Sequence, residues 1–279
     1  MKVPTGLRSF YLKLANHFSK NAIPSYQYGF KNILQPELCQ AVIDKLDLRL
    51  KYPNSASNLD IVDVFPGFGL FSTMLNYELK PRNHILIDSN KNLIQTWNNR
   101  IQELKATGEY PENFHLYEKD GYVWETFDQM VEVDHLIKPK IQSGDKIHDE
   151  LLIVGNLTPP KFGESLLAQW IMCCGYGNWL QKYGRVRMIC FTTEHTASKF
   201  TAQENYLKRN RTSAKRDTFI DIKLTAIQQA LDPLNPDGQG YDPRVLVKDQ
   251  PIVMPREAIS TDADLAIVEM SPKGNNDLD

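Results

Sequence analysis

The chain has 279 residues, of which 42% are hydrophobic and 10% aromatic, and its net charge is −2 at pH 7. This composition supplies a buried core and excludes a disordered chain, and the near-neutral charge restricts any nucleic-acid surface to a local patch. No apolar run approaches the roughly 18 residues of a membrane-spanning helix, so no membrane partner is expected.

The first 36 residues contain five basic residues and neither aspartate nor glutamate. Phe10, Leu14 and Phe18 recur every four residues, which places them on one face of a helix. A basic, amphipathic and acid-free segment is typical of a mitochondrial import signal. An ordinary basic arm explains the same pattern, so both interpretations remain open for residues 1–27.

Apolar segments of strand length alternate with segments of helical period along the rest of the chain. Pro36 opens a predicted helix, Pro81 stops another, and five prolines between residues 232 and 256 indicate a loop. The alternation predicts a doubly wound, mostly parallel α/β domain over residues 28–270, followed by a polar tail over 271–279. Strands are predicted at 59–64, 84–87, 114–117, 151–154, 186–191, 222–227 and 266–270.

The loop DVFPGFGL, residues 63–70, follows the first predicted strand and leads into a helix. Gly67 and Gly69 lack a Cβ, so the backbone there can approach a ligand closely. A tight turn without a ligand explains these two glycines equally well.

Asp63, Asp88 and Asp120 stand at the tips of the first three predicted strands. Together they predict a crevice for a nucleoside-containing cofactor, with Asp88 at the ribose and Asp120 at the exocyclic amine of an adenine. S-adenosylmethionine suits this set, because its sulfonium cation favours nearby carboxylates. For each aspartate alone, a solvated or helix-capping position is the alternative.

Five segments resemble, in the same order along the chain, those of the ribosomal RNA adenine N6-dimethyltransferases. They are YGFKNI (28–33), DVFPGFG (63–69), ILIDSN (85–90), EKDGYVW (118–124) and VGNLTPP (154–160). The resemblance implies a class I S-adenosylmethionine-dependent methyltransferase fold. In that family a small helical domain follows the last strand, whereas this chain stops at Asp279, so that domain is missing here or the sequence is a fragment. The implied cofactor contacts are Ile33, Asp63, Gly67, Gly69, Asp88, Asp120 and Asn156.

The catalytic positions of that family are altered in this chain. In the enzymes an asparagine and a proline bind the target amine, and the aromatic residue that follows stacks on the flipped adenine. Here Asn156 is kept, but Thr158 replaces the proline and Pro159 the aromatic residue, and losing such a ring costs roughly 1–3 kcal/mol. Phe65 replaces the first glycine of the loop, where its bulk crowds the methionine moiety. Asn156, Thr158 and Pro159 are therefore interpreted as vestigial, and no catalytic residue is assigned.

A narrower resemblance is to the fungal branch of the mitochondrial transcription factor B family, which descends from these dimethyltransferases. The segments KLDL (45–48), NWL and YGRVRM (178–188), FIDIKLTAI (219–227) and AIVEM (266–270) carry it. The resemblance implies a place in the mitochondrial matrix and the single-subunit mitochondrial RNA polymerase as a partner. It also implies contact with promoter DNA, especially the melted single strand, and with RNA.

The segment KRNRTSAKR, residues 208–216, contains five basic residues and no acid. Neutralisation of phosphates by these side chains predicts salt-sensitive nucleic-acid binding, and a solvated basic loop is the alternative. Tyr183, Phe191 and Phe200 are candidate platforms for unstacked bases. The five basic residues are Lys208, Arg209, Arg211, Lys215 and Arg216.

The leading interpretation is a transcription initiation factor that helps the polymerase recognise and melt promoters without chemistry. The alternative is an S-adenosylmethionine-dependent rRNA adenine N6-dimethyltransferase. A small-molecule methyltransferase is a third interpretation, but it leaves the basic segment without a role. The four cysteines and six histidines lack metal-ligand spacing, so no metal is expected and the thiols are expected to be reduced.

Overall fold

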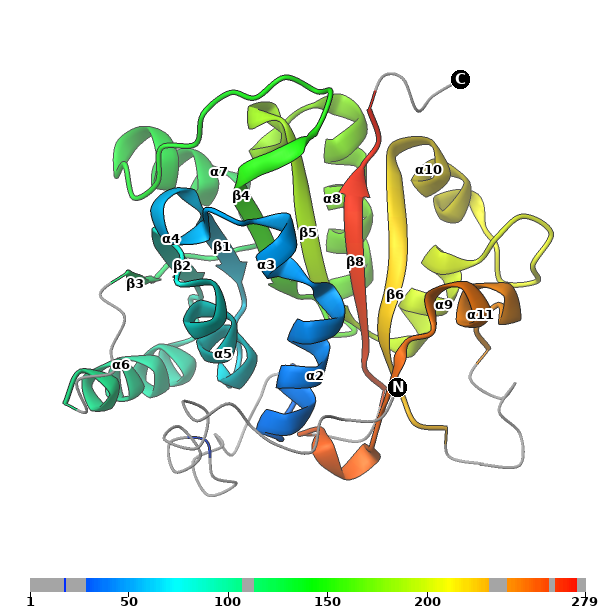
Figure 1. Cartoon of the computed structure of the whole chain (residues 1–279), viewed down its shortest axis with the longest axis horizontal. Coiled ribbons are helices and arrows are strands. Elements are labelled where there is room, and N and C mark those ends of the chain that lie inside the picture. The colour runs from blue at the N-terminus through cyan, green and yellow to red at the C-terminus, as the bar shows by residue number, and fades with distance from the viewer. Residues whose placement is uncertain (1–17, 19–28, 107–112, 231–239, 261–263, 275–279) are drawn as a thin grey trace.

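An eight-stranded sheet forms the centre of the protein, with strand order β3-β2-β1-β4-β5-β8-β6-β7 (Figure 1). The computed structural model describes residues 18, 29–106, 113–230, 240–260 and 264–274. β8 is antiparallel to its neighbours β5 and β6, and the other neighbouring pairs are parallel. The predicted doubly wound, mostly parallel sheet is therefore confirmed. The strands are β1 (Asp60–Val64), β2 (Asn83–Ile87), β3 (Phe114–Tyr117), β4 (Ile147–Asn156), β5 (Arg185–Thr192), β6 (Ile220–Gln228), β7 (Ile252–Met254) and β8 (Ala266–Pro272).

Helices cover both faces of the sheet, because the side chains of buried strands alternate between two apolar cores. α2 and α5 pack on the face that carries Ile61 and Ile189, and α8 packs on the face that carries Ile153 and Met188. Figure 1 shows α2 and α5 in front of the sheet and α8 behind it. The helices are α2 (Pro36–Leu46), α3 (Leu48–Lys51), α4 (Ser55–Asn58), α5 (Leu70–Leu79), α6 (Lys91–Ala106), α7 (Trp124–Asp128), α8 (Gly163–Tyr176), α9 (Glu194–Thr201), α10 (Arg211–Phe219) and α11 (Pro243–Asp249). Short helical turns occupy Gln129–Val133, Trp179–Tyr183 and Arg256–Ala258.

Pro243, Pro251 and Pro255 stand at the ends of regular elements, so the prediction of a loop over residues 232–256 was wrong for the described residues 240–256. Pro243 stands in the first turn of α11, where a missing N–H costs nothing, and the Asp242 side chain caps that helix by accepting from the N–H of Arg244 at 3.0 Å. After Pro251, β7 pairs with the end of β6. Residues 231–239 of the same stretch lie outside the described residues.

The N-terminal arm contributes one described side chain to the core. Phe18 is buried, with its ring centroid 5.6 Å from that of Phe68 in an edge-to-face contact. The guanidinium of Arg100 lies 4.3 Å from the Phe18 ring centroid and donates to the carbonyl of Phe68. Burial lowers the pKa of Arg100 to about 10. The rest of the predicted import segment lies outside the described residues.

Candidate functional site

The central strands β1 and β4 are the point where the chain changes direction across the sheet. From β1 it continues outward to β2 and β3, and from β4 it continues the other way to β5. In open α/β sheets, ligands bind beyond the carboxyl ends of the strands at such a point. A hollow of about 530 Å³ lies there, and a smaller one beside it has room for about one water, 20 Å³. The larger hollow, here called the cleft, is lined by Phe30, Phe65, Asp88, Ser89, Asn90, Asp120, Tyr122, Lys161 and Phe162.

Two of the three predicted aspartates meet in the cleft. Asp88 follows β2 and is buried, and its Oδ1 accepts a hydrogen bond from the N–H of Asn90 at 2.8 Å. Its other oxygen, Oδ2, has no hydrogen-bond partner among the described residues, and burial raises the pKa of this carboxyl to about 6. Asp120 is exposed at the same cleft. An unpartnered carboxylate oxygen beside an open hollow fits a donor such as a ribose hydroxyl.

Asp63 has a partner within the protein and does not line the cleft. It belongs to β1 and is buried, and His84 Nε2 lies 3.0 Å from its Oδ2. Asn76 donates to His84 Nδ1 at 3.1 Å, so the imidazole proton is on Nε2 and points at Asp63. Asp63 and Ile33 both line the smaller hollow, and Ile33 forms a backbone bridge with Ile259. The predicted cofactor contacts at Asp63 and Ile33 therefore border one water-sized space.

Gly67 and Gly69 are required by packing within the protein. Both have positive φ, +58° and +89°, which a side chain rarely adopts. A Cβ on Gly67 would overlap the amide of Asn32, and a Cβ on Gly69 would overlap the ring of Trp97. The Asn32 Oδ1 also accepts from the N–H of Phe68 at 3.0 Å, which ties the turn to the early segment. A tight turn explains both glycines without a ligand.

Three phenylalanine rings fill the part of the cleft beside the glycine turn. The ring centroid of Phe65 lies 5.6 Å from that of Phe30 and 5.5 Å from that of Phe162, and Tyr122 contacts Phe162 at 6.1 Å. These rings offer no acceptor for an amino group and no donor for a carboxylate. The Asp88 side of the cleft therefore fits the nucleoside half of S-adenosylmethionine, and the ring-filled part beside the glycine turn does not fit its amino-acid half.

The aromatic side chains of the cleft differ from those proposed as base platforms. Phe200 is buried in the core, and Phe191 packs against Phe71 with ring centroids 4.9 Å apart. Tyr183 precedes β5, at the opposite end of the sheet. Tyr122 and Phe162 line the cleft instead, and neither was predicted. The position of Tyr122 two residues after Asp120 is the sequence feature that could have placed it at the cleft.

Asn156 is locked by its own neighbours. Its Nδ2 donates to the carbonyl of Lys31 at 2.9 Å, and its Oδ1 accepts from the Thr158 hydroxyl at 2.6 Å. The same hydroxyl oxygen accepts from the N–H of Lys31 at 2.9 Å. Asn156, Thr158 and Pro159 are all buried. We call these contacts the Lys31 clamp. Because of them, both Nδ2 and Oδ1 of Asn156 already have hydrogen-bond partners within the protein.

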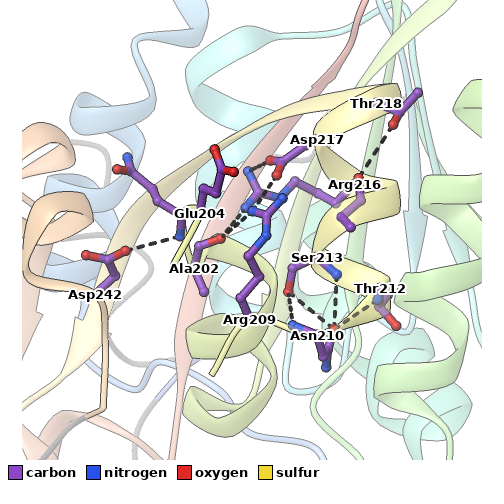
Figure 2. Close-up of polar contacts among 12 residues, drawn as sticks. Ala202, Glu204, Arg209, Asn210, Thr212, Ser213, Arg216, Asp217, Thr218 and Asp242 are labelled. Carbon is purple, nitrogen blue, oxygen red and sulfur yellow. Dashed lines mark hydrogen bonds and ion pairs between the residues drawn. The ribbon is translucent and has the colours of Figure 1, made fainter. Parts of the chain in front are cut away.

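From Arg211 onward the basic segment forms helix α10, so the alternative of a solvated basic loop was wrong there, and two of its arginines are bound within the protein. Asn210 caps α10 by accepting from the N–H of Thr212 and of Ser213 at 2.9 and 3.0 Å. Figure 2 shows the guanidinium groups of Arg209 and Arg216 converging on Asp217, at 2.5 and 2.6 Å.

The same two guanidinium groups also donate to the carbonyl of Ala202, at 3.4 and 2.8 Å, so they connect α10 to the end of α9. Arg216 is only 8% exposed, so burial removes it as a phosphate contact. Lys208 is half-buried, with its Nζ 3.4 Å from the Ser198 hydroxyl. Arg211 and Lys215 are exposed and remain as predicted phosphate contacts.

Replacing Thr158 tests the Lys31 clamp. The Thr158→Val variant keeps the shape of the side chain but removes the hydroxyl that the Lys31 N–H and the Asn156 Oδ1 bind. Because both groups lose a hydrogen-bond partner, we expect a loss of about 2 kcal/mol in the free energy of unfolding. The measurement is urea denaturation followed by circular dichroism. Thr158→Ser is the matched control and should lose clearly less, because its hydroxyl stays. Equal stability of the valine variant and the parent would contradict the clamp.

The raised pKa of Asp88 predicts a pH dependence. Because the carboxyl titrates near 6 when folded and near 3.8 when unfolded, its contribution to stability is greatest below pH 4 and falls as the pH rises through 6. At pH 8 we expect Asp88→Asn to unfold with a free energy up to about 3 kcal/mol higher than the parent, and at pH 4 with a similar one. Thermal melts at both pH values measure this. Glu125→Gln, which replaces an exposed carboxylate that does not affect Asp88, is the control. A gain in stability of Asp88→Asn that did not depend on pH would contradict the assignment.

Two features hold for the described part of the chain as a whole. None of its helices is long and apolar enough to cross a bilayer. It also contains no group of three or more His, Cys, Asp or Glu side chains placed to hold a metal ion.

Comparison with known proteins agrees with the motifs. The Mitochondrial transcription factor 1 proteins of Saccharomyces paradoxus and Saccharomyces cerevisiae are each 29% identical to this chain over 247 residues, which is 88% of this chain and 68% of each relative. That of Lachancea kluyveri is 33% identical over 201 residues, or 72% of this chain and 56% of that protein. A solved dimethyladenosine transferase from Plasmodium falciparum superposes with a TM-score of 0.46 at 13% identity, covering 86% of this chain and 63% of that one.

The family model for ribosomal RNA adenine dimethylase matches residues 24–279, almost the whole chain. The motif order and the class I methyltransferase-like sheet lead to the same assignment. The chain belongs to the ribosomal RNA adenine dimethylase family.

Proposed function

We propose that this chain is a mitochondrial transcription initiation factor built on a methyltransferase scaffold. It acts in the matrix and assists the single-subunit mitochondrial RNA polymerase in recognising and melting promoters. The relatives named Mitochondrial transcription factor 1 support this function. The observation that carries it is the Lys31 clamp, because it takes up the amide that methyl transfer to an adenine would need.

The alternative function, dimethylation of an rRNA adenine, has the family membership in its favour. It needs a free acceptor for the target amine and a ring to stack on the base. The Asn156 Oδ1 already accepts from Thr158, and Pro159 is buried and offers no comparable π-face. Binding of S-adenosylmethionine would place its ribose at Asp88 and its base near Asp120, and no methyl-transfer step is assigned to it.

Holding a melted promoter requires surfaces that replace base stacking. Separating stacked bases costs about 1.4 kcal/mol per step, and an aromatic platform returns roughly 1–3 kcal/mol per base. Tyr122 is 44% exposed at the rim of the cleft, and Val123 and Trp124 are exposed beside it. Lys161 supplies a cation at the same cleft. We assign the unstacked bases to this rim and backbone phosphates to Arg211 and Lys215 of α10. RNA would be held through the same chemistry.

Run-off transcription with the cognate mitochondrial polymerase tests the function directly. The parent protein should raise promoter-specific transcripts, and Tyr122→Ala should reduce the open-promoter yield about 5- to 100-fold, the equivalent of one lost stacking platform. Fluorescence of 2-aminopurine in the promoter reports the opening. Tyr122→Phe keeps the ring and should behave as the parent does. If the protein does not change the transcript yield and forms dimethyladenosine on an rRNA substrate, the alternative function, rRNA adenine dimethylation, would be established.

The two exposed cations of α10 make a separate prediction. Arg211→Ala combined with Lys215→Ala should weaken binding to single-stranded promoter DNA and flatten its salt dependence by about 1.4 in the slope of log K against log salt. Fluorescence anisotropy at several salt concentrations measures the slope. The control pair is Lys105→Ala with Lys138→Ala, which are exposed outside α10. A slope equal to that of the parent would remove α10 from the nucleic-acid surface.

A further inference from the structure

A second large hollow lies at the other end of the sheet from the cleft. It has a volume of about 490 Å³ and lies where β5 and β6 begin and β8 ends. Figure 1 shows these strand ends near the C-terminus, between α3 on one side and α11 on the other. We call this hollow the amino-end groove. Its charged lining residues are Lys51, Arg187, Arg216, Asp217, Asp221, Lys223, Lys248, Asp249, Glu269 and Lys273.

The floor of the amino-end groove is a buried ionic cluster on the face of the sheet. Glu269 of β8 is buried, and its Oε1 contacts Lys51 Nζ of α3 at 2.6 Å and also the guanidinium of Arg187. Arg187 donates to the Ser271 hydroxyl at 3.1 Å as well. Its Nε is buried and has no partner among the described residues. The cluster holds cations in fixed positions at the base of the groove.

Cations outnumber carboxylates in this lining, six to four. Most of the carboxylates are already engaged: Glu269 by Lys51 and Arg187, Asp217 by two arginines, and Asp249 by the N–H of Leu224 at 2.8 Å. Lys223 of β6 and Lys248 of α11 are exposed, and neither has an ion pair among the described residues. The groove therefore offers two unpaired ammonium groups to an anionic partner.

The surroundings of these lysines fit a protein segment better than a nucleic acid. Asp221 is 73% exposed in the groove, where it would repel a continuous row of phosphates. Two exposed apolar side chains stand next to lining lysines in the sequence, outside the lining itself. Leu50, next to Lys51 on α3, is 76% exposed, and Val247, next to Lys248 on α11, is 75% exposed. A segment with carboxylates spaced between apolar residues would contact both the lysines and these neighbouring side chains, whereas phosphates would contact the lysines alone.

We propose that the amino-end groove binds an acidic segment of the mitochondrial RNA polymerase, in which carboxylates flanked by apolar residues pair with Lys223 and Lys248. The choice of partner rests on the proposed function. The groove lies at the opposite end of the strands from the cleft, so a bound polymerase would leave the cleft rim open to the bases. Helix α10 contributes Arg216 and Asp217 to the groove, so its exposed cations Arg211 and Lys215 would hold phosphates beside the polymerase.

Charge reversal combined with zero-length cross-linking tests this surface. A carbodiimide joins a lysine to a carboxylate only where the two form an ion pair, so it should link Lys223 or Lys248 to aspartates or glutamates of the polymerase. Lys223→Glu with Lys248→Glu should weaken polymerase binding at least tenfold in anisotropy titrations. Lys223→Arg with Lys248→Arg should bind as the parent does yet lose these cross-links. The control Lys105→Glu with Lys138→Glu adds the same charge outside the groove and should bind as the parent does.

The outcomes separate this inference from the function on which it rests. In one outcome the parent binds the polymerase and stimulates transcription, but charge reversal does not change the affinity and the groove lysines form no cross-links. The groove is then not the polymerase-binding surface, and the proposed function is unaffected. If the parent neither binds the polymerase nor stimulates transcription, both fail. If the reversed variant loses affinity for duplex promoter DNA alone, the groove binds nucleic acid and the inference is wrong. Thermal melts of each variant establish that it is folded.

Discussion

The backbone N–H and carbonyl of Lys31 are both bound by side chains at the end of β4, those of Thr158 and Asn156. The Lys31 N–H donates to the Thr158 hydroxyl, its carbonyl accepts from the Asn156 amide, and the hydroxyl donates to the same amide. Each group is buried or half-buried, so removing any one leaves another unpaired at a cost of about 1–3 kcal/mol. The next residues extend this constraint. Asn32 accepts from Phe68, and Leu34 donates to the carbonyl of Ala258. The early segment thus holds together the loops at the carboxyl end of the sheet.

The same contacts separate this protein's site from the enzymes that it resembles. Where proline stands in the enzyme motif, threonine adds a hydroxyl, and that hydroxyl takes up the amide oxygen of Asn156. Where glycine stands in the enzyme loop, Phe65 adds a ring that packs between Phe30 and Phe162. Both replacements exchange contacts with a ligand for contacts within the protein. The cleft keeps a carboxylate oxygen, Asp88 Oδ2, without a partner among the described residues, and such an oxygen can accept from a ribose hydroxyl.

Some charged side chains of this protein form ion pairs within it, and others are exposed to solvent. The number of charged residues in a segment of the sequence does not show which of them are paired. Arg209 and Arg216 bind Asp217 and also the carbonyl of Ala202, which connects α10 to the end of α9, while Arg211 and Lys215 of the same segment face solvent. In the amino-end groove, Lys51 and Arg187 neutralise Glu269, whereas Lys223 and Lys248 have no ion pair among the described residues. A guanidinium with several donors can satisfy a carboxylate and a carbonyl at once, which makes arginine the residue for the internal positions.

The sequence by itself determined the alternating sheet, the order of the motifs and the family, because apolar periodicity and strand-tip residues depend on local chain geometry. It also pointed to Asp88, Asp120 and Asn156. Only the tertiary structure decided what those residues contact. It showed that Asn156 is bound by Lys31, 125 positions away, and that Phe162, in the loop between β4 and α8, lines the cleft in place of the predicted aromatic residues. Helix α11 and strand β7 were hidden for the same reason. Val245 of α11 packs in the core and Asp249 accepts from the N–H of Leu224, and the three-residue strand β7 pairs with β6. Pairing and burial arise between segments that are remote in sequence, and local pattern carries no record of them.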